Sequence, residues 1–331
     1  MKTYRWGILA PGKIAHKFSQ GLQLTSNGKV YAIGSRDAGR ANDFAKQYGA
    51  EKSYGTYEGL INDPDVDVIY IASPHTFHYQ HTKECLAAGK PVLCEKPFTI
   101  NSKQFRHLMK IAGEKELFMM DALWTRFHPH ILKLHELIKE GRLGKIRTLE
   151  ADFGFYSDFD PESRLFNPDL GGGSLLDIGI YPVFLSLLIL GYPKEISAQA
   201  YLGKTNIDES LSVSLLYESG AVASLLCSFK AWTGTTARIS GEEGRIFIPE
   251  SWFNPNNFYL IDRNKESTTF EFPENDNGYQ YEAIEVMKCL DNNKKQSDLL
   301  PHQFTLQLIE LMDEIRVKAG IKYKEDQQQL I

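Results

Sequence analysis

A turn close to the N-terminus has residue types and spacing that suit the binding of a phosphate group. The apolar segment Arg5–Leu9 runs into this turn, and a helical pattern follows it. Such a turn places a pyrophosphate on a helix N-terminus, where free backbone N–H groups and the helix dipole favour negative charge. The match to a dinucleotide fingerprint is partial, since Ala10 stands where the first glycine is expected, and an ordinary tight turn is the alternative. The residues of the turn are Ala10, Pro11, Gly12, Lys13 and Ile14.

The residues after the second predicted strand indicate which dinucleotide is bound. An NAD site usually has an acidic residue there that hydrogen-bonds the ribose hydroxyls, whereas this chain has Ser35 and Arg36. A guanidinium at that position suits a 2′-phosphate. The neighbouring Asp37 leaves a solvated charge pair with Arg36 as the alternative. The sequence therefore favours NADP over NAD as the cofactor.

Two polar residues interrupt the most apolar stretch of the chain, Leu175–Leu190. Asp177 and Tyr181 are spaced i, i+4, so a helix places them on one face. A carboxylate in an apolar helix is costly unless it is paired or hydrogen-bonded, for example to a substrate hydroxyl or to Lys96. The spacing predicts a face that lines a ligand site. The alternatives are a bond from Asp177 to backbone at the glycine-rich helix start, and core packing for Tyr181.

Histidine spacing raises the question of a metal site. His75, His78 and His81 have the pattern H-x-x-H-x-x-H, but His75 falls in a loop before the helix, and no cysteine or glutamate completes a ligand set. His128 and His130 flank a proline that is more simply the start of a helix. The sequence therefore predicts no metal.

Four segments resemble one known family, and they span most of the chain. They are Ile71–His78, Ala87–Pro97, Trp124–Phe127 and Gly171–Pro182. Together they make the chain similar to the glucose-fructose oxidoreductase / inositol dehydrogenase (Gfo/Idh/MocA) family, whose most specific motif here is Glu95-Lys96-Pro97. Tyr181, in place of the more usual histidine, resembles the dimeric dihydrodiol dehydrogenase branch. The resemblance implies a Rossmann domain with a parallel sheet, followed by an α+β domain with a large open, mostly antiparallel sheet.

The resemblance also implies a division of chemical roles. Oxidation of an alcohol by hydride transfer leaves a proton on the substrate oxygen, which a base must remove. Tyr181 is the expected base, and because a free phenol titrates near pH ~10, it needs a cation such as Lys96 to favour the phenolate. Asp177 is expected to orient the substrate, and the Lys96-Pro97 bond to be cis.

Further residues are assigned to the site by position within the family motifs. The cofactor-lining residues that the resemblance implies, beyond the first turn, Ser35 and Arg36, are Ser73, Pro74, His75, His78, Glu95, Lys96, Trp124 and Arg126. An aromatic and polar substrate wall is expected from Phe153, Phe155 and Arg164, with Trp124. A surface helix histidine is the alternative for His78, and core packing is the alternative for Trp124.

These residues predict an NAD(P)-dependent dehydrogenase or reductase. Its expected substrate is a small cyclic sugar, polyol or vicinal diol that reacts at a CH–OH group. The alternative is a non-catalytic NADP-binding sensor or regulatory protein, because fold does not fix function. The large open sheet leaves a broad face to cover, so a homodimer is expected.

The elements that must position these residues follow two patterns. Up to residue 121, β-rich runs alternate with helices: strands at 5–9, 30–35, 66–72, 91–94 and 117–121, and helices at 14–24, 40–48 and 79–88. Beyond a helix at 130–140, strands at 146–155, 195–202, 209–217, 221–228, 235–240 and 245–248 follow almost without helices. Helices at 281–292 and 302–319 close the chain, before a tail from Glu325 that is expected to fray. The predicted domains are 1–121, for the dinucleotide, and 122–331, for substrate and oligomerisation, with a last helix able to pack back on the first domain.

Composition excludes several other classes of protein. The 331 residues carry 37 basic and 42 acidic side chains, a net charge of −5, with no basic block, so nucleic-acid binding is not expected. The four cysteines stand apart and are expected to be reduced thiols. Because the N-terminus lacks the pattern of a signal peptide, and Leu175–Leu190 is interrupted by Asp177, Gly179 and Pro182, we expect a cytoplasmic protein with a buried helix there and no membrane span.

Overall fold

The computed structural model describes residues 2–273 and 277–328, which form two compact units. The first unit holds the chain up to Phe127 together with Asn277–Leu306, and the second holds the chain from His128 to Pro273 together with Gln307–Gln328. These units divide the chain six residues beyond the boundary predicted at 121, and they return a C-terminal segment to the first unit. The functional division into domains stays a prediction.

The sheet of the first unit is parallel throughout, with strand order β3-β2-β1-β4-β5-β6. The central strands β4 and β5 are buried along their whole length, as expected of a parallel sheet covered by helices on both faces. The strands are β1 (Tyr4–Leu9), β2 (Gly28–Gly34), β3 (Lys52–Tyr54), β4 (Val68–Ile71), β5 (Val92–Glu95) and β6 (Met119–Ala122).

Helices connect these strands, and side-chain caps fix where several of them begin. Asp37, Thr56 and Asn101 each accept a hydrogen bond from a backbone amide of the first turn that they precede. Gly49 ends α2 with a left-handed backbone, φ 68°. The helices are α1 (Lys13–Gln23), α2 (Ala38–Tyr48), α3 (Tyr57–Ile61), α4 (His78–Ala87), α5 (Ser102–Glu114) and α8 (Tyr279–Asp291), with 3-10 helices η1 (His75–Phe77) and η2 (Trp124–Phe127).

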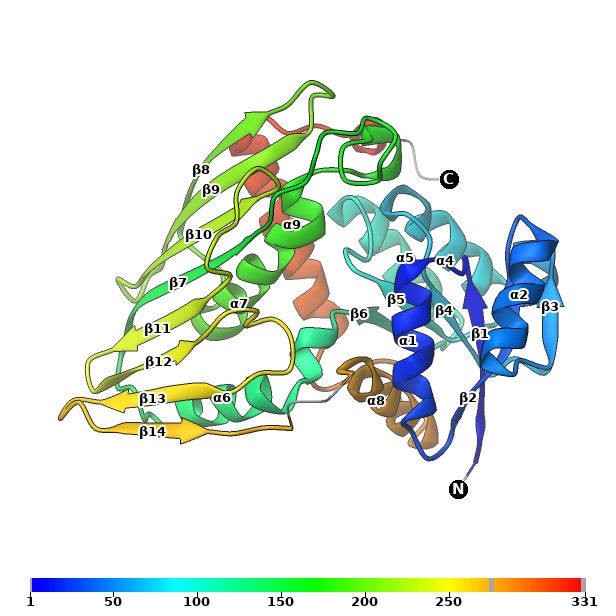
Figure 1. Cartoon of the computed structure of the whole chain (residues 1–331), viewed down its shortest axis with the longest axis horizontal. Coiled ribbons are helices and arrows are strands. Elements are labelled where there is room, and N and C mark those ends of the chain that lie inside the picture. The colour runs from blue at the N-terminus through cyan, green and yellow to red at the C-terminus, as the bar shows by residue number, and fades with distance from the viewer. Residues whose placement is uncertain (1, 274–276, 329–331) are drawn as a thin grey trace. The chain divides into compact units, whose positions relative to one another are not determined.

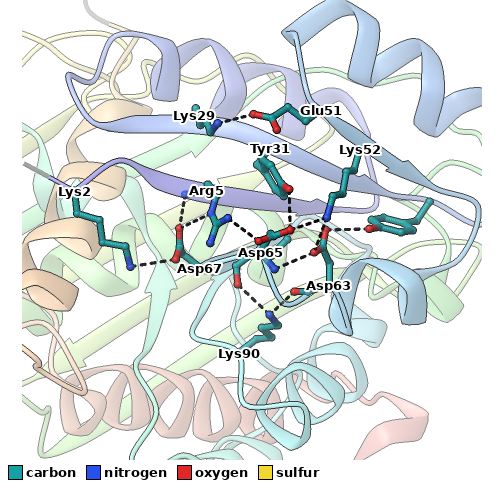
Figure 2. Close-up of polar contacts among 12 residues, drawn as sticks. Lys2, Arg5, Lys29, Tyr31, Glu51, Lys52, Asp63, Asp65, Asp67 and Lys90 are labelled. Atoms are coloured by element: carbon teal, nitrogen blue, oxygen red, sulfur yellow. Dashed lines mark hydrogen bonds and ion pairs between the residues drawn. The ribbon is translucent and has the colours of Figure 1, made fainter.

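A network of charged residues joins the amino-terminal ends of the parallel strands (Figure 2). The Lys52 ammonium lies 3.0 Å from both Asp63 and Asp65, and Arg5 contacts Asp65 at 2.9 Å and Asp67 at 3.3 Å. Lys90 donates to the backbone carbonyl of Asp63. Ligands bind parallel sheets at the carboxyl ends of the strands, and this network lies at the opposite end. The network therefore stabilises the sheet and takes no part in the predicted ligand site.

The second unit is built on an eight-stranded sheet, with strand order β14-β13-β12-β11-β7-β10-β9-β8. Neighbours are antiparallel except β7 and β10, which are parallel. The strands are β7 (Ile146–Gly154), β8 (Glu195–Leu202), β9 (Asp208–Leu216), β10 (Val222–Ser228), β11 (Ala237–Gly241), β12 (Gly244–Ile248), β13 (Phe258–Asp262) and β14 (Ser267–Phe270).

Helices cover one face of this sheet, α6 (Pro129–Lys139), α7 (Ile180–Leu190) and the part of α9 (His302–Ala319) that belongs to this unit, as Figure 1 shows. Exposed residues alternate with buried ones along most of β9 and β10, and with half-buried ones along β8. The exposed set includes large apolar side chains, Tyr201, Leu216, Val222 and Leu226. Within the described chain the outward face of these strands is therefore uncovered.

The segment that contains α7 is apolar enough to resemble a membrane span. An 18-residue window within Pro168–Leu190 has a mean hydropathy of 1.9, yet 83% of that window is buried inside the protein, as in the core helix of a globular domain. Its start is π-helical, over Leu175–Gly179 (η4), before α7 begins.

The predicted fold class is confirmed, while four short elements and one thirteen-residue helix were not predicted. The missing elements are β3, α3, α5, β13 and β14. The tail prediction was wrong for its described part, since Lys324–Gln327 form a 3-10 helix (η5), and Arg316 binds the Asp326 carboxylate with contacts of 3.1 and 3.0 Å. Residues 329–331 of that prediction lie outside the described chain.

Candidate dinucleotide and catalytic sites

The carboxyl ends of the parallel strands bring the predicted cofactor segments to one edge of the first unit. The strand order reverses between β1 and β4, which is where ligands bind in open parallel sheets. The turn after β1, the Ser35–Arg36 pair after β2, the loop after β4 and the Glu95-Lys96-Pro97 turn after β5 all emerge at this edge.

The turn after β1 has the geometry that a pyrophosphate requires. Ala10 takes a left-handed backbone, φ 66°, which is the conformation that usually favours glycine. Gly12 is extended, and a Cβ built on it would come no closer than 4.0 Å to the Ala10 carbonyl oxygen. Neither backbone conformation nor internal packing therefore demands a glycine at position 12. The remaining reason for a glycine at position 12 is that a ligand must come close to the backbone there.

Helix α1 leaves its N-terminus open to an anion. Gly12 is the N-cap residue, no side chain caps the helix, and no acidic residue lies in the first turn. The amides of Lys13 and Ile14 fall among the first N–H groups of a helix, which have no partner within it. Open amides, space at Gly12 and the positive end of the helix dipole together fit a dinucleotide phosphate.

Arg36 is exposed at the end of β2, and its neighbour Asp37 is already engaged. The Asp37 carboxylate accepts the Arg40 amide at 2.9 Å and so caps α2, while the Asp37 amide donates to the Ser35 hydroxyl at 3.2 Å. The sequence left open an ion pair between Arg36 and Asp37. The capping of α2 accounts for the Asp37 carboxylate without that pair.

His78 links the loops that follow β4 and β5. Its ring is fully buried, with Nε2 at 2.7 Å from the Ser73 carbonyl oxygen and Nδ1 at 2.8 Å from that of Pro97. Burial lowers the pKa of His78 to about 4, against the opposing effect of the two carbonyls, which favour the protonated ring. Both nitrogens face protein atoms, so His78 offers neither to a ligand. It is not a surface histidine, and its two contacts hold the turn after β5; its place in the cofactor site stays a prediction.

The remaining residues of the β4 loop range from buried to half-buried. Ser73 is buried, and its hydroxyl lies 2.9 Å from Nδ1 of His81. Pro74 and His75 are half-buried at the start of η1. Burial, assisted by the charge of Arg36, lowers the pKa of His81 to about 4.

The Glu95-Lys96-Pro97 turn contains the predicted cis peptide, between Lys96 and Pro97. Glu95 is buried and accepts a hydrogen bond from the Tyr70 hydroxyl. Burial and the Glu95 charge raise the pKa of Tyr70 well above its usual value, so Tyr70 remains a donor. Lys96 is half-buried at the end of β5.

Trp124 and Arg126 lie on η2, directly after the last parallel strand. Trp124 stacks on Tyr279, with ring centroids 4.1 Å apart and 12° between the planes, so at least one face of the indole is used in packing. Arg126 is buried, and its Nε donates to the Leu299 carbonyl at 2.8 Å, while Nη1 has no hydrogen-bond partner among the described residues. Burial lowers the pKa of Arg126 to about 10, which leaves it charged. A buried donor of this kind fits a carbonyl or phosphate oxygen of a ligand.

In the second unit, Asp177 and Tyr181 lie on successive helical segments, η4 and α7. Single π-helical turns are frequent at functional sites. Asp177 is buried, and the Arg164 guanidinium donates two hydrogen bonds to its carboxylate, at 2.8 Å and 3.2 Å. The predicted partners for Asp177 were a substrate hydroxyl, Lys96 or nearby backbone, and the structure adds the guanidinium of Arg164. The pair holds the carboxylate in a fixed orientation.

Aromatic rings surround Tyr181. Its ring centroid lies 5.6 Å from Phe153 and 5.1 Å from Phe253, and these two phenylalanines stack on each other at 4.1 Å. Phe155 lies 6.4 Å from Phe153 and 5.4 Å from Phe229. Phe253 was missed from the sequence because it follows no motif and lies on a loop far along the chain.

A buried carboxylate fixes the start of the segment that carries Asp177 and Tyr181. Asp208 accepts the Leu175 amide at 2.6 Å and the Ser174 hydroxyl at 2.8 Å. Burial raises its pKa to about 6, against these hydrogen bonds. Asp208 was also missed, because an N-terminal cap supplied from a distant strand leaves no local pattern. Among the described residues, no group of three histidine, cysteine or acidic side chains is placed to hold a metal ion.

Comparison with known proteins extends these observations to the whole chain. Residues 4–122 match the model of the oxidoreductase family with an NAD-binding Rossmann fold, and residues 131–247 match the GFO/IDH/MocA C-terminal domain. Fold, phosphate turn and family models together define an oxidoreductase that binds a nicotinamide dinucleotide. The chain belongs to the GFO/IDH/MocA family.

Relatives and solved structures agree with this placement. Trans-1,2-dihydrobenzene-1,2-diol dehydrogenase of Mus musculus is 36% identical and that of Bos taurus 35%, each match covering 97% of this chain and 98% of the relative. The 3-ketoreductase KijD10 of Actinomadura kijaniata, in complex with NADP and TDP-benzene, has a TM-score of 0.86 at 25% identity, with 96% of this chain and 98% of that chain covered. Aldose-aldose oxidoreductase of Caulobacter crescentus shares the fold, with a TM-score of 0.86 at 23% identity, over the same shares of the two chains.

Proposed function

We propose that this oxidoreductase interconverts a hydroxyl and a carbonyl on a small ring that carries a neighbouring hydroxyl, with NADP as its preferred cofactor. The observation that carries the proposal is the setting of Tyr181: its phenol lies beside a stacked pair of phenylalanine rings, on a segment that also carries Asp177, the partner of Arg164. Apolar ring faces suit a flat or alicyclic carbon skeleton, and a fixed carboxylate suits its hydroxyl groups. The full-length relatives named as dehydrogenases of a cyclic diol support the same class of substrate.

Tyr181 is the proposed acid and base. When bound, the nicotinamide supplies or accepts the hydride, so the protein must move only the hydroxyl proton. The Tyr181 phenolate takes that proton during oxidation, and the resulting phenol returns it during reduction. Lys96 provides the positive charge that favours the phenolate. Asp177, held by Arg164, accepts the hydrogen bond of a substrate hydroxyl and so sets which carbon faces the cofactor.

Replacement of Tyr181 by Phe tests the assignment. The variant keeps the aromatic packing but has no proton to exchange, so turnover of a cyclic trans-diol should fall by orders of magnitude while NADP affinity stays close to wild type. Turnover is followed by the absorbance of the reduced nicotinamide. Wild-type turnover in the variant would refute the role of Tyr181, and a wild-type protein that binds NADP but turns over no diol, polyol or sugar would favour the sensor alternative.

The preference for NADP is proposed from Arg36. An exposed guanidinium at the end of β2, beside an aspartate occupied in capping, leaves a positive group for the 2′-phosphate. Calorimetric titration of NADP and of NAD into wild-type protein and into Arg36→Ala should show a preference that the variant abolishes. Lys46→Ala removes another exposed charge, from α2, and is the control. An unchanged preference in Arg36→Ala would contradict the proposal.

A homodimer formed through the open sheet is proposed from the uncovered face of β8, β9 and β10. Val222 and Leu216 lie opposite each other in register and both are exposed, with Leu226 further along the same strand. A second copy of the same face would bury these side chains in a symmetric contact. Sedimentation should give a dimer for wild type and a monomer for Val222→Lys/Leu226→Lys. Leu24→Lys, at an exposed leucine of the first unit, should remain dimeric.

A cytoplasmic location is proposed from the thiols. Cys85, Cys94, Cys227 and Cys289 are all free and buried, the usual state of cysteines in a reducing compartment. Cell fractionation tests this, and recovery of the native protein from an oxidising compartment would contradict it.

A further inference from the structure

Tyr323 is a buried phenol near the end of the chain that the proposed chemistry has not used. It follows α9, and its hydroxyl donates to the Gly172 carbonyl oxygen at 2.6 Å, across 151 positions of sequence. Burial and the Asp208 charge raise the pKa of Tyr323 well above its usual value, so the hydroxyl remains a donor. This bond ties the C-terminal segment to the glycine turn, Gly171–Gly173.

The glycine turn leads directly into the segment that carries Asp177 and Tyr181. The Gly173 carbonyl oxygen accepts the Asp177 amide at 3.2 Å, so the turn and Asp177 share a backbone hydrogen bond. The Leu175 amide, between them, is held by Asp208. A displacement of the turn would therefore pass directly to the backbone of Asp177.

Gly173 shows how closely the C-terminal segment approaches this turn. Its φ of 125° is a conformation that favours glycine. A Cβ built on it would lie 2.4 Å from Oδ1 of Asp208 and 2.6 Å from the Tyr323 hydroxyl oxygen. These two side chains thus fill the space that a side chain at position 173 would need. Asp208 holds the turn from β9, and Tyr323 holds it from the C-terminal segment.

The C-terminal segment is itself anchored within the same unit. Arg316 on α9 is buried and binds the Asp326 carboxylate with contacts of 3.1 and 3.0 Å. That carboxylate also accepts the Tyr323 amide at 3.0 Å. Lys324 lies 2.8 Å from Asp169, shortly before the glycine turn. Because the backbone of Tyr323 is fixed in this way, its hydroxyl can hold the turn in one position.

We propose that Tyr323 is a positioning residue for the proposed reaction: its hydroxyl fixes the glycine turn, and through the turn it sets the position of Asp177. The inference rests on the proposed function, in which Asp177 orients a substrate hydroxyl. It gives the C-terminal segment a part in the reaction. Tyr323 acts through Asp177 and exchanges no proton with the substrate.

Replacement of Tyr323 by Phe tests the inference, because it removes one hydroxyl and keeps the ring. Since a small misplacement of a catalytic group can cost on the order of 100-fold in rate, kcat/KM for a cyclic diol should fall about 10- to 100-fold, with NADP affinity close to wild type. Tyr192→Phe is the matched control. It removes a hydroxyl bond of 2.7 Å to Glu314 on α9, beyond the other end of α7, and should keep the wild-type kcat/KM. Wild-type kcat/KM in Tyr323→Phe, or an equal loss in both variants, would overturn the proposal.

A double-mutant cycle with Asp177→Asn separates positioning from general damage to the fold. Residues that act through one another are not additive. If Tyr323 acts through Asp177, then Tyr323→Phe should cost little further kcat/KM once the Asp177 carboxylate is absent. The same fold-loss in both backgrounds would show that Tyr323 does not act through Asp177, and the proposal would fail.

A further measurement does not depend on turnover. Hydrogen–deuterium exchange followed by mass spectrometry reports how well the backbone amides of residues 171–181 are protected. They should exchange several-fold faster in Tyr323→Phe than in wild type or Tyr192→Phe, because the turn has lost a bond that held it. Asp326→Asn loosens the same segment from its other side and should speed exchange there as well. Exchange at the wild-type rate in both Tyr323→Phe and Asp326→Asn would overturn the inference. A wild-type protein without turnover would refute the proposed function, and the exchange rates would still decide whether Tyr323 holds the turn.

Discussion

A substitution at Gly12 should weaken NADP binding while leaving the stability of the fold almost unchanged. Replacing it with Ala adds one methyl group, whose nearest atom is 4.0 Å away, on a backbone with φ −114° that alanine adopts readily. The unfolded chain loses freedom, which stabilises the protein by about 0.4–1 kcal/mol. Alanine is a poorer N-cap than glycine by about 1 kcal/mol. The two effects offset each other, so the free energy of unfolding should change by less than about 1 kcal/mol.

Binding should respond quite differently to the same methyl group. If the space at Gly12 admits a pyrophosphate, the methyl group keeps the phosphate from the amides at the start of α1. Loss of two hydrogen bonds to a charged group, at about 1.5–3 kcal/mol each, weakens binding by about 3–6 kcal/mol. At about 1.4 kcal/mol per tenfold, the Kd for NADP should rise at least 100-fold.

Calorimetric titration with NADP and thermal unfolding of the same samples provide the assay. Gly113→Ala in α5 is the control, because that glycine also has open space around it and lies away from the turn. It should bind NADP as wild type does and gain about 1 kcal/mol of stability from helix propensity. Wild-type affinity in Gly12→Ala would refute the phosphate site, as would a loss of affinity matched by a loss of several kcal/mol in stability.

Three further outcomes are expected. Tyr181→Phe should abolish turnover and leave NADP binding intact, by the assay already described. Arg164→Gln removes the charge that holds Asp177, so the KM for a cyclic diol should rise about tenfold or more, given about 1.5–3 kcal/mol for a hydrogen bond to a charged group, with NADP affinity unchanged in titration. Asp63→Asn should lower the free energy of unfolding by about 1.5–3 kcal/mol at neutral pH and reduce the loss of stability in acid, as measured by denaturant titration at several pH values.

The sign of the acid effect follows from the pKa of Asp63. Burial alone would raise it, but hydrogen bonds from the Asp65 amide, Lys52 and Tyr54 outweigh burial and hold the pKa below its usual value. A carboxyl group whose pKa is lower in the folded protein stabilises the fold above its unfolded pKa of about 3.9. That contribution is lost as the pH falls through the lower, folded value. A wild type and an Asp63→Asn variant with parallel stability profiles in acid would contradict this reasoning.

The sequence predicts the fold well because the patterns that determine it are local. Buried runs such as Val68–Ile71, followed by helices, are typical of parallel strands. Most of the elements that escaped prediction are short, such as the three-residue β3 and the β13–β14 pair, whose residues lack a sustained period. Their pairing comes from neighbours in the sheet and leaves little trace in the sequence. The thirteen-residue α5 is different, because its cap Asn101 and its buried Phe105, Leu108 and Ala112 could have been recognised.

The site was predictable only where a motif carried it. The turn after β1 and the Glu95-Lys96-Pro97 segment could be located because their residue types follow a strand at fixed spacing. Phe253 lies on a loop and reaches Tyr181 through tertiary packing, so no periodicity marks it. Asp37 differs, because an aspartate before a helical run is a recognisable N-cap, and the capping of α2 could have been predicted.

Asp37 and Asp177 show why residue types alone do not assign a carboxylate. Asp37 is adjacent to Arg36 in sequence, yet its carboxylate caps α2, so Arg36 keeps its charge available to a phosphate. Asp177 is thirteen residues from Arg164, yet the two form a bidentate ion pair. The adjacent pair fails because the helix amide of Arg40 presents a better-aligned donor than a flexible neighbouring side chain. The distant pair forms because Asp177 is buried and therefore requires a charged partner. Whether an arginine can bind a ligand thus depends on the other partners of the nearby carboxylate. Asp37 is occupied by a helix amide and leaves Arg36 available, whereas Asp177 takes up Arg164.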